Sequence, residues 1–169
     1  MTLSMYQASV PVFVRGLENL SAVLAKGAAH AEARKIEPAV FVNARLAPDM
    51  FPFSRQIQIA SDAAKGCTAR LAGAEVPSYP DTEATFPELE ARIAKTIAFV
   101  KGFTAAQIDG SEARSVTLKM RSGDMTLRGQ DYLFKLSLPN FYFHITTAYD
   151  ILRHNGVEVG KMDYLGKLA

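Results

Sequence analysis

The chain contains three histidines and one cysteine, the side chains that most often act as general bases, nucleophiles or metal ligands. His144 and His154 lie ten residues apart in one long apolar stretch. In an α-helix this spacing separates them by about 15 Å along the axis and turns them to different faces, so they cannot bind the same ion. His30 lies in an earlier, irregular stretch and could approach only one of them. The residues therefore do not predict a three-imidazole metal site.

Polar residues accompany His144 on or beside the apolar face of its expected helix. Buried polar groups cost free energy unless they are hydrogen-bonded, so this face should border a partly hydrated cavity or a hydrogen-bond network. The candidates for lining such a pocket are Gln56, Asn140, His144 and Thr147. His144 is most simply a hydrogen-bonded core histidine near Asn140. A ligand-binding or catalytic role, and a weak metal site completed by Gln and Asp oxygens, are the alternatives.

The single cysteine, Cys67, lies inside an apolar helical pattern, which predicts a small buried hydrophobic residue. A nucleophilic cysteine needs surroundings that lower the pKa of its thiol, and the neighbours on this face are apolar. A lone cysteine forms no intramolecular disulfide, which is typical of a reducing compartment. We find no Ser-His-Asp signature, phosphate-binding loop or dinucleotide fingerprint.

The composition is ordinary for a folded domain: the 169 residues are 49% hydrophobic and 21% charged. The net charge is +2, with lysines and arginines scattered, which argues against a nucleic-acid or membrane surface. No apolar run approaches the roughly 18 residues of a membrane span, and the N-terminus lacks the pattern of a signal peptide. We therefore expect one domain, 1–169, in the cytoplasm.

Four segments show the three-and-four apolar spacing of amphipathic helices. The expected helices lie near 4–28, 53–72, 86–103 and 130–155. Pro11 predicts a kink or a late start in the first, and Pro139 a bend in the last. In the last helix the apolar stripe should comprise Leu133, Leu136, Asn140, Phe143, Thr147 and Ile151.

Two local signals complete the expected fold. Thr85, Pro87 and Glu88 fit a capping box that begins the third helix. Residues 115–128 alternate apolar and polar side chains around a turn at Ser122-Gly123-Asp124, which predicts a β-hairpin. The sequence therefore predicts a mainly all-α protein, an up-down four-helix bundle with a small hairpin before the last helix.

Three longer stretches resemble a known family. They read AxVPVFVRxLxxLxxxLxK at 8–26, DMFPFxRQxQxASDxAKG at 49–66 and PNFYFHxTTAYxILRHNGVxxGKxDYLG at 139–166. Together with the order of elements, they resemble the uncharacterised bacterial family called domain of unknown function 1993. That family is similar in fold to the DinB/YfiT-like superfamily of metalloenzymes. The resemblance covers nearly the whole chain.

The resemblance implies a four-helix bundle, often dimeric, in which some members hold a divalent metal through three histidines. Related members are thiol-dependent transferases. The metal-binding histidines come from helix two and from a His-x-x-x-His pair in helix four. Here His144 matches the region of the pair, but Ala148 stands four residues later, and 53–72 contains no histidine. The nearest polar substitutes there are Gln56, Gln58 and Asp62.

Two functional hypotheses follow. The first is a non-catalytic small-molecule-binding or interaction protein with a degenerate metal site, which needs no cofactor. The alternative is a metal- or thiol-dependent transferase-like enzyme with altered ligands, for which His144 would be a weak metal ligand. We also expect a homodimer, on the resemblance and on aromatic side chains too numerous for one helix face: Tyr132, Phe134, Phe141 and Tyr142.

Overall fold

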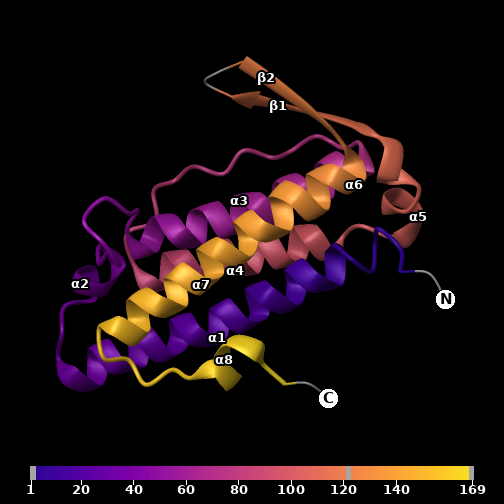
Figure 1. Cartoon of the computed structure of the whole chain (residues 1–169). Helices are drawn as coiled ribbons and strands as arrows, with labels where there is room; N and C mark the ends of the chain where they lie inside the picture. The colour runs from indigo at the N-terminus through magenta and orange to yellow at the C-terminus, as the bar shows by residue number, and fades with distance from the viewer. Residues whose placement is uncertain (1–2, 121–122, 168–169) are drawn as a thin grey trace.

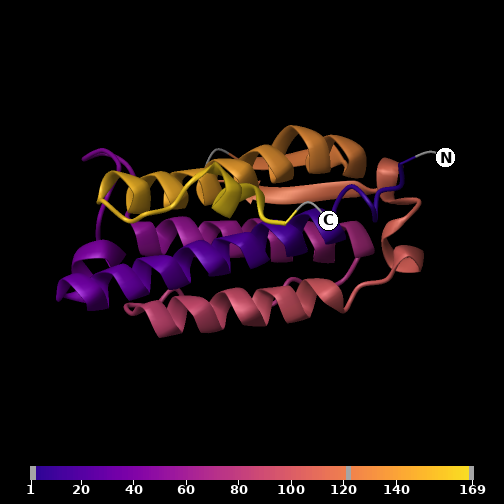
Figure 2. The same ribbon diagram turned by 90° about the horizontal axis from the view of Figure 1, so that it is seen from below.

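The computed structural model describes residues 3–120 and 123–167. Within these residues, four long helices lie side by side (Figures 1 and 2). They are α1 (Val10–Arg34), α3 (Phe53–Ala72), α4 (Phe86–Lys101) and α7 (Leu138–His154). The shorter elements are α2 (Pro38–Val42), α5 (Ala105–Ile108), η1 (Ser111–Ala113), β1 (Ser115–Met120), β2 (Gly123–Arg128), α6 (Gly129–Asp131), η2 (Tyr132–Ser137) and α8 (Lys161–Leu165). None of the helices in the described residues is long and apolar enough to cross a membrane.

The core lies between the four long helices. α3 packs against α4 and α7, and α1 packs against the same two helices from the other side. Large apolar side chains from all four are fully buried, among them Phe13, Leu17, Ile57, Leu89, Ile93 and Phe141. Each such side chain stabilises the fold by about 1.5–3 kcal/mol relative to an exposed position.

The mainly helical bundle with its hairpin is confirmed, but the helices do not alternate strictly up and down. Phe86 at the start of α4 contacts Phe53 at the start of α3, with ring centroids 6.2 Å apart. α3 and α4 therefore run in the same direction. The segment 73–85, which connects them, runs back along the length of α3, as Figure 1 shows. A connecting segment of this length needs contacts that hold it against the helices.

Several helices and strands lie where local sequence signals predicted them. α3 has the predicted bounds and ends at Gly73, whose positive φ of 69° suits glycine. The capping box at the start of α4 is formed: the Glu88 amide donates to Thr85 Oγ1 and the Thr85 amide to Glu88 Oε2, 3.0 Å away. β1 and β2 pair antiparallel as predicted, with Val116 opposite Leu127. The predicted turn is partly wrong, because Gly123 and Asp124 already belong to β2 and pair with Met120 and Lys119. Ser122 lies outside the described residues.

The first helix differs from its predicted range of 4–28. It begins at Val10, so Pro11 lies in the first turn, where its missing N–H costs nothing. The late start that Pro11 predicted is therefore confirmed. The helix continues to Arg34 and ends at Lys35 in the left-handed conformation. His30, expected in an irregular stretch, therefore lies within this helix.

The predicted stripe of the last helix is partly wrong. Phe143 is 55% exposed, whereas Phe141 and Ala148 are fully buried. The cause is η2, a π-helical turn at Tyr132–Ser137 that precedes Pro139. A π turn contains more residues than an α turn, so it rotates the following residues to other faces. Pro139 has no N–H to donate to the turn before it, which is where the helix departs from the α geometry.

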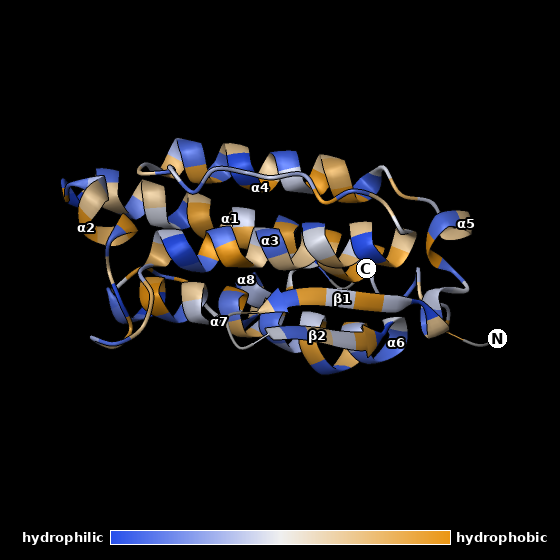
Figure 3. Ribbon diagram, turned by 90° about the horizontal axis from the view of Figure 1, so that it is seen from above, coloured by the Kyte–Doolittle hydropathy of each residue, from blue (hydrophilic) through white to orange (hydrophobic). Residues whose placement is uncertain are grey.

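The hairpin and the tail cover two sides of the bundle. In the view of Figure 3 the hairpin overlaps α6 and part of α7, and Val116 of β1 is buried. α8 packs on α1. There the Arg15 guanidinium donates to the Leu165 carbonyl at 2.8 Å, and the Asn19 amide donates to the Tyr164 carbonyl at 3.0 Å.

Candidate functional site

Two of the predicted pocket residues, Gln56 and His144, meet in the core. His144 Nδ1 lies 2.7 Å from Gln56 Oε1, and Gln56 Nε2 donates to the Phe51 carbonyl at 2.9 Å. Both side chains are buried. An amide oxygen can only accept, so His144 Nδ1 carries a proton and donates. The hydrogen-bond partner of His144 is therefore Gln56 on α3 and not Asn140.

The surroundings keep His144 neutral. Burial lowers the pKa of His144 to about 4, and the positive charge of Arg55 acts in the same direction. The ring of Phe143 stands nearly perpendicular to the imidazole, with centroids 5.2 Å apart. At neutral pH this histidine is an uncharged part of the packing between α3 and α7.

The other two predicted residues do not join this pair. Thr147 is buried, but its hydroxyl donates to the Phe143 carbonyl of its own helix at 2.8 Å. Such a bond uses the one proton of the hydroxyl within the helix, so it leaves no donor for a ligand. Asn140 is half-buried and lines a different cavity, described below.

The residues around His144 do not fit the three-histidine metal site of the superfamily. The nearest side chain on α3 is an amide, Gln56, and it already occupies the Nδ1 atom of His144. Ala148 offers no donor. Across residues 3–120 and 123–167, no group of three or more His, Cys, Asp or Glu side chains is placed to hold a metal ion. Neutral amide oxygens are also poor zinc ligands compared with imidazole or thiolate.

Cys67 does not offer a nucleophile. It is fully buried, and burial raises the pKa of its thiol to about 12, although Ser137 and Arg70 act in the opposite direction. A thiol with this pKa is almost entirely protonated at neutral pH and therefore unreactive.

A cavity of about 300 Å³ opens where β1 and the π turn meet α3. We call it the hairpin pocket; its lining residues are Ile59, Asp62, Ala63, Arg70, Leu118, Tyr132, Leu136, Ser137 and Asn140. Asn140 is the one predicted residue that lines it. π turns occur frequently at functional sites, because the extra residue redirects side chains. Here the turn supplies Tyr132, Leu136 and Ser137 to one wall.

Arg70 contributes a positively charged guanidinium to the hairpin pocket. Its Nη1 atom donates to the Tyr132 hydroxyl at 3.0 Å, and its guanidinium carbon lies 5.9 Å from the centre of that ring. A Cβ atom at Gly66, one turn earlier, would lie 2.4 Å from Arg70 Nη1. Gly66 therefore leaves the space in which the guanidinium lies against α3. No carboxylate among the described residues forms an ion pair with Arg70.

Asp62, farther along the same pocket, is already neutralised. Its Oδ1 atom lies 2.9 Å from Lys65 Nζ and 3.0 Å from Arg92 Nη2. The Lys65 and Arg92 side chains are only 5% and 1% exposed. Two buried cations thus share one carboxylate, so this end of the pocket carries no unpaired negative charge.

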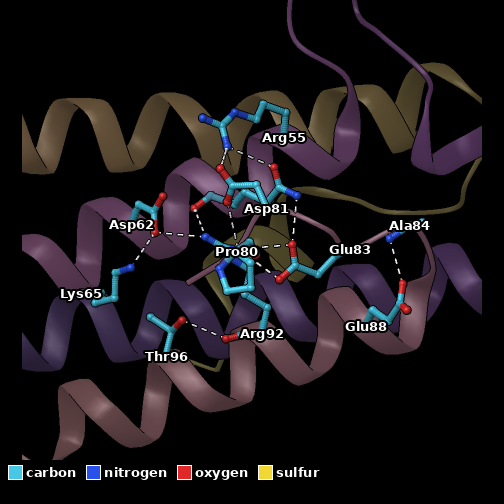
Figure 4. Close-up of polar contacts among 11 residues, drawn as sticks. Arg55, Asp62, Lys65, Pro80, Asp81, Glu83, Ala84, Glu88, Arg92 and Thr96 are labelled. Carbon is cyan, nitrogen blue, oxygen red and sulfur yellow. Dashed lines mark hydrogen bonds and ion pairs between the residues drawn. The ribbon is translucent and has the colours of Figure 1, made fainter. Parts of the chain in front are cut away.

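Arg92 also fastens the returning segment 73–85 (Figure 4). Its Nη1 atom lies 3.0 Å from Asp81 Oδ1 and from Glu83 Oε1, and it donates to the Pro80 carbonyl at 3.1 Å. Arg55 pairs with Asp81. The ring of Tyr79 has the Lys65 and Lys95 ammonium groups 4.0 and 4.1 Å from its centre. These contacts hold the segment across α3 and α4.

Sequence reasoning singled out neither Arg70 nor Arg92. Arg92 is 3% exposed, because carboxylates from another segment surround it. The signal that could have found it is the pair of acidic residues, Asp81 and Glu83, inside a proline-rich loop. No comparable signal marks Arg70, since its pocket depends on where the hairpin packs.

These features define the class: a bundle of DinB type with an added hairpin and a pocket beneath it. The crystal structure of a DinB family member protein from Shewanella denitrificans is similar, with a TM-score of 0.89 and 43% sequence identity over 96% of this chain and 92% of that one. The sequence model of the domain of unknown function DUF1993 matches residues 5–165, so the chain belongs to that family. Among curated proteins, none matches.

Proposed function

We propose that this protein is a non-catalytic small-molecule-binding protein whose ligand occupies the hairpin pocket. The observation that carries the proposal is the lining of this 300 Å³ cavity. Apolar walls from Ile59, Ala63 and Leu118 meet polar groups from Arg70 and Asn140. Small-molecule sites typically combine an apolar lining with a few converging polar groups.

The chemistry of the remaining candidates supports binding over catalysis. A nucleophile or general base works best with a pKa near the operating pH. The pKa of Cys67 is raised to about 12 and that of His144 lowered to about 4, both chiefly by burial. The alternative, a metal- or thiol-dependent transferase, would need a metal held by ligands other than three histidines. Elemental analysis of untagged protein distinguishes the two, since stoichiometric zinc, nickel or iron lost in His144→Ala would favour the enzyme.

The rest of the proposal concerns the whole chain. Residues 1–169 act as one cytoplasmic domain that binds neither nucleic acid nor membrane. Two copies pair through aromatic side chains on the outer face of the last helix: Phe134, Tyr142 and Phe143, which are 45%, 43% and 55% exposed. Tyr132 and Phe141, two of the aromatic residues from which the dimer was expected, are buried and belong to the core.

Filling the pocket tests the binding proposal. Ala63 lines the pocket from α3, so Ala63→Leu should occupy it without touching Arg70. The matched control is Ala98→Leu on the exposed side of α4. We expect small aromatic probes (benzoate, benzamide and benzamidine) observed by ligand-detected NMR to include at least one that binds wild type and Ala98→Leu but not Ala63→Leu. Equal binding to all three proteins, or no binding to wild type, would contradict the proposal.

A further inference from the structure

We infer that the hairpin pocket is selective for monoanionic carboxylates with a compact apolar body, and that Arg70 is the residue that selects them. This inference rests on the proposed function, because it names the class of ligand that the pocket takes. It depends on three properties of the pocket: its net charge, the way in which Arg70 is held, and the nature of its walls.

The charge of the pocket comes from Arg70. Asp62 and Arg70 are the two charged residues that line it, eight residues or about 12 Å apart along α3. Asp62 is paired with Lys65 and Arg92, at 2.9 and 3.0 Å. Arg70 has no such partner among the described residues. A guanidinium is charged at every physiological pH, so the pocket presents one unneutralised positive charge.

Arg70 is also held in place for recognition. The Tyr132 hydroxyl accepts from Nη1 at 3.0 Å, and Gly66 provides the space beside it. Burial raises the pKa of Tyr132, so its phenol stays neutral and does not cancel the charge. The other N–H groups of the guanidinium have no hydrogen-bond partner in the part of the chain that the structure describes. A planar fork with open donors matches the two oxygens of a carboxylate.

The walls and the single charge narrow the class further. The pocket has apolar walls, formed by Ile59, Ala63, Leu118 and Leu136. Such walls suit a ligand that has a ring or a branched chain next to its anionic group. A phosphate monoester carries about −1.5 to −2 charge at pH 7, so one arginine would leave it partly unneutralised in a half-buried site. A carboxylate carries the single charge that Arg70 balances.

Four probes of one size test this assignment: benzoate, benzamide, benzamidine and phenyl phosphate, titrated by NMR. We expect wild type to bind benzoate about tenfold or more tightly than the other three, the range of a charge-assisted hydrogen bond. Arg70→Met should abolish this preference and leave benzamide binding unchanged. The control is Lys119→Met, which removes an exposed cation of β1 and should keep the preference.

A second variant covers the case in which Arg70→Met does not fold. Gly66→Ala leaves the guanidinium intact but places a Cβ 2.4 Å from Nη1, so it should displace the guanidinium, weaken benzoate binding and spare benzamide. If wild type binds benzamide as tightly as benzoate, or phenyl phosphate more tightly, the carboxylate assignment is wrong while the pocket stands. If none of the four probes binds wild type, the proposed function fails and this inference fails with it.

Discussion

The Nδ1 atom of His144 lies 2.7 Å from the side-chain oxygen of Gln56, a residue 88 positions earlier. Gln56 in turn donates to the Phe51 carbonyl, so one amide links α7, α3 and the segment that leads into α3. Both partners are buried, so this is a buried polar cross-link between the two helices. Each group in such a link becomes costly when its partner is removed.

His144→Ala should therefore lower the free energy of unfolding by about 1–3 kcal/mol, because it removes packing and leaves Gln56 Oε1 unpaired. The measurement is urea unfolding at pH 7.5. His154→Ala is the control: this histidine is exposed at the end of the same helix and should change stability by less than about 0.5 kcal/mol. Equal midpoints for wild type and His144→Ala would instead make His144 the first candidate for a functional role.

The same histidine should make stability depend on pH. Its pKa falls from 6.5 to about 4 on folding, so between these values the unfolded chain binds more protons. The stabilisation is complete above pH 6.5 and is lost as the pH falls toward 4. Its size is on the order of 2 kcal/mol, after allowance for partial solvent screening. His144→Gln removes the titrating group, so the stability difference between wild type and this variant should shrink from pH 7.5 to 4. Parallel pH curves would contradict the assignment.

Arg92→Met tests the fastening of the segment 73–85. We expect a loss of about 2–3 kcal/mol, less than the roughly 3–5 kcal/mol for a fully buried pair, because Lys65 and Arg55 still partner Asp62 and Asp81. The control is Lys101→Met, on the same helix as Arg92. It removes the exposed ion pair between Lys101 and Glu18 and should cost less than about 1 kcal/mol. Hydrogen exchange should rise in 73–85 for Arg92→Met alone. Unchanged exchange there would show that other contacts hold the segment.

At Gly16, α1 packs closely against α7. A Cβ atom at this position would lie 2.5 Å from Phe141 Cε1, a ring that is fully buried. Gly16→Ala should therefore destabilise by about 1–3 kcal/mol, although alanine favours helix. The double variant Gly16→Ala/Phe141→Leu relieves the collision, so the two changes together should cost less than their sum. Strict additivity in thermal or urea unfolding would argue against this contact.

The proposed pairing of two copies has a direct measurement. Light scattering at micromolar concentration should give about twice the 18.4 kDa of one chain. Phe143→Lys places a charge on the most exposed aromatic of the outer face and should shift the mass to that of a monomer. Lys161→Glu on α8 changes an exposed charge elsewhere and should leave the dimer intact. A monomer for wild type would refute the pairing.

The features that could be predicted from sequence depend on neighbours in the chain. The bounds of α3, the Thr85–Glu88 capping box and the presence of the hairpin follow from patterns within a few residues. The π turn before Pro139 shifted Phe143 outward, and periodicity alone does not reveal an extra residue in a turn. For Gln56 and His144, the sequence predicted that both line one pocket but not that they form a hydrogen bond with each other.

The candidate site was harder to predict, because its groups depend on tertiary structure. Arg92 is buried only because Asp81 and Glu83 return to it along a segment that does not follow simple helix alternation. Arg70 lines a pocket only because the hairpin packs over α3 and places Leu118 opposite it. Neither residue differs, in its local pattern, from a solvated arginine on a helix surface.

The docking of α8 on α1 determines when the fold can be completed during synthesis. Arg15 and Lys26 contact groups 137 to 152 residues later in the chain. During translation α1 is made before α8, so its outer face stays uncovered until residue 167 has left the ribosome. Contacts of such long sequence separation slow folding and leave apolar surface open to misassembly meanwhile. A nascent chain that stalls after α7 would therefore present the same uncovered face of α1 to chaperones.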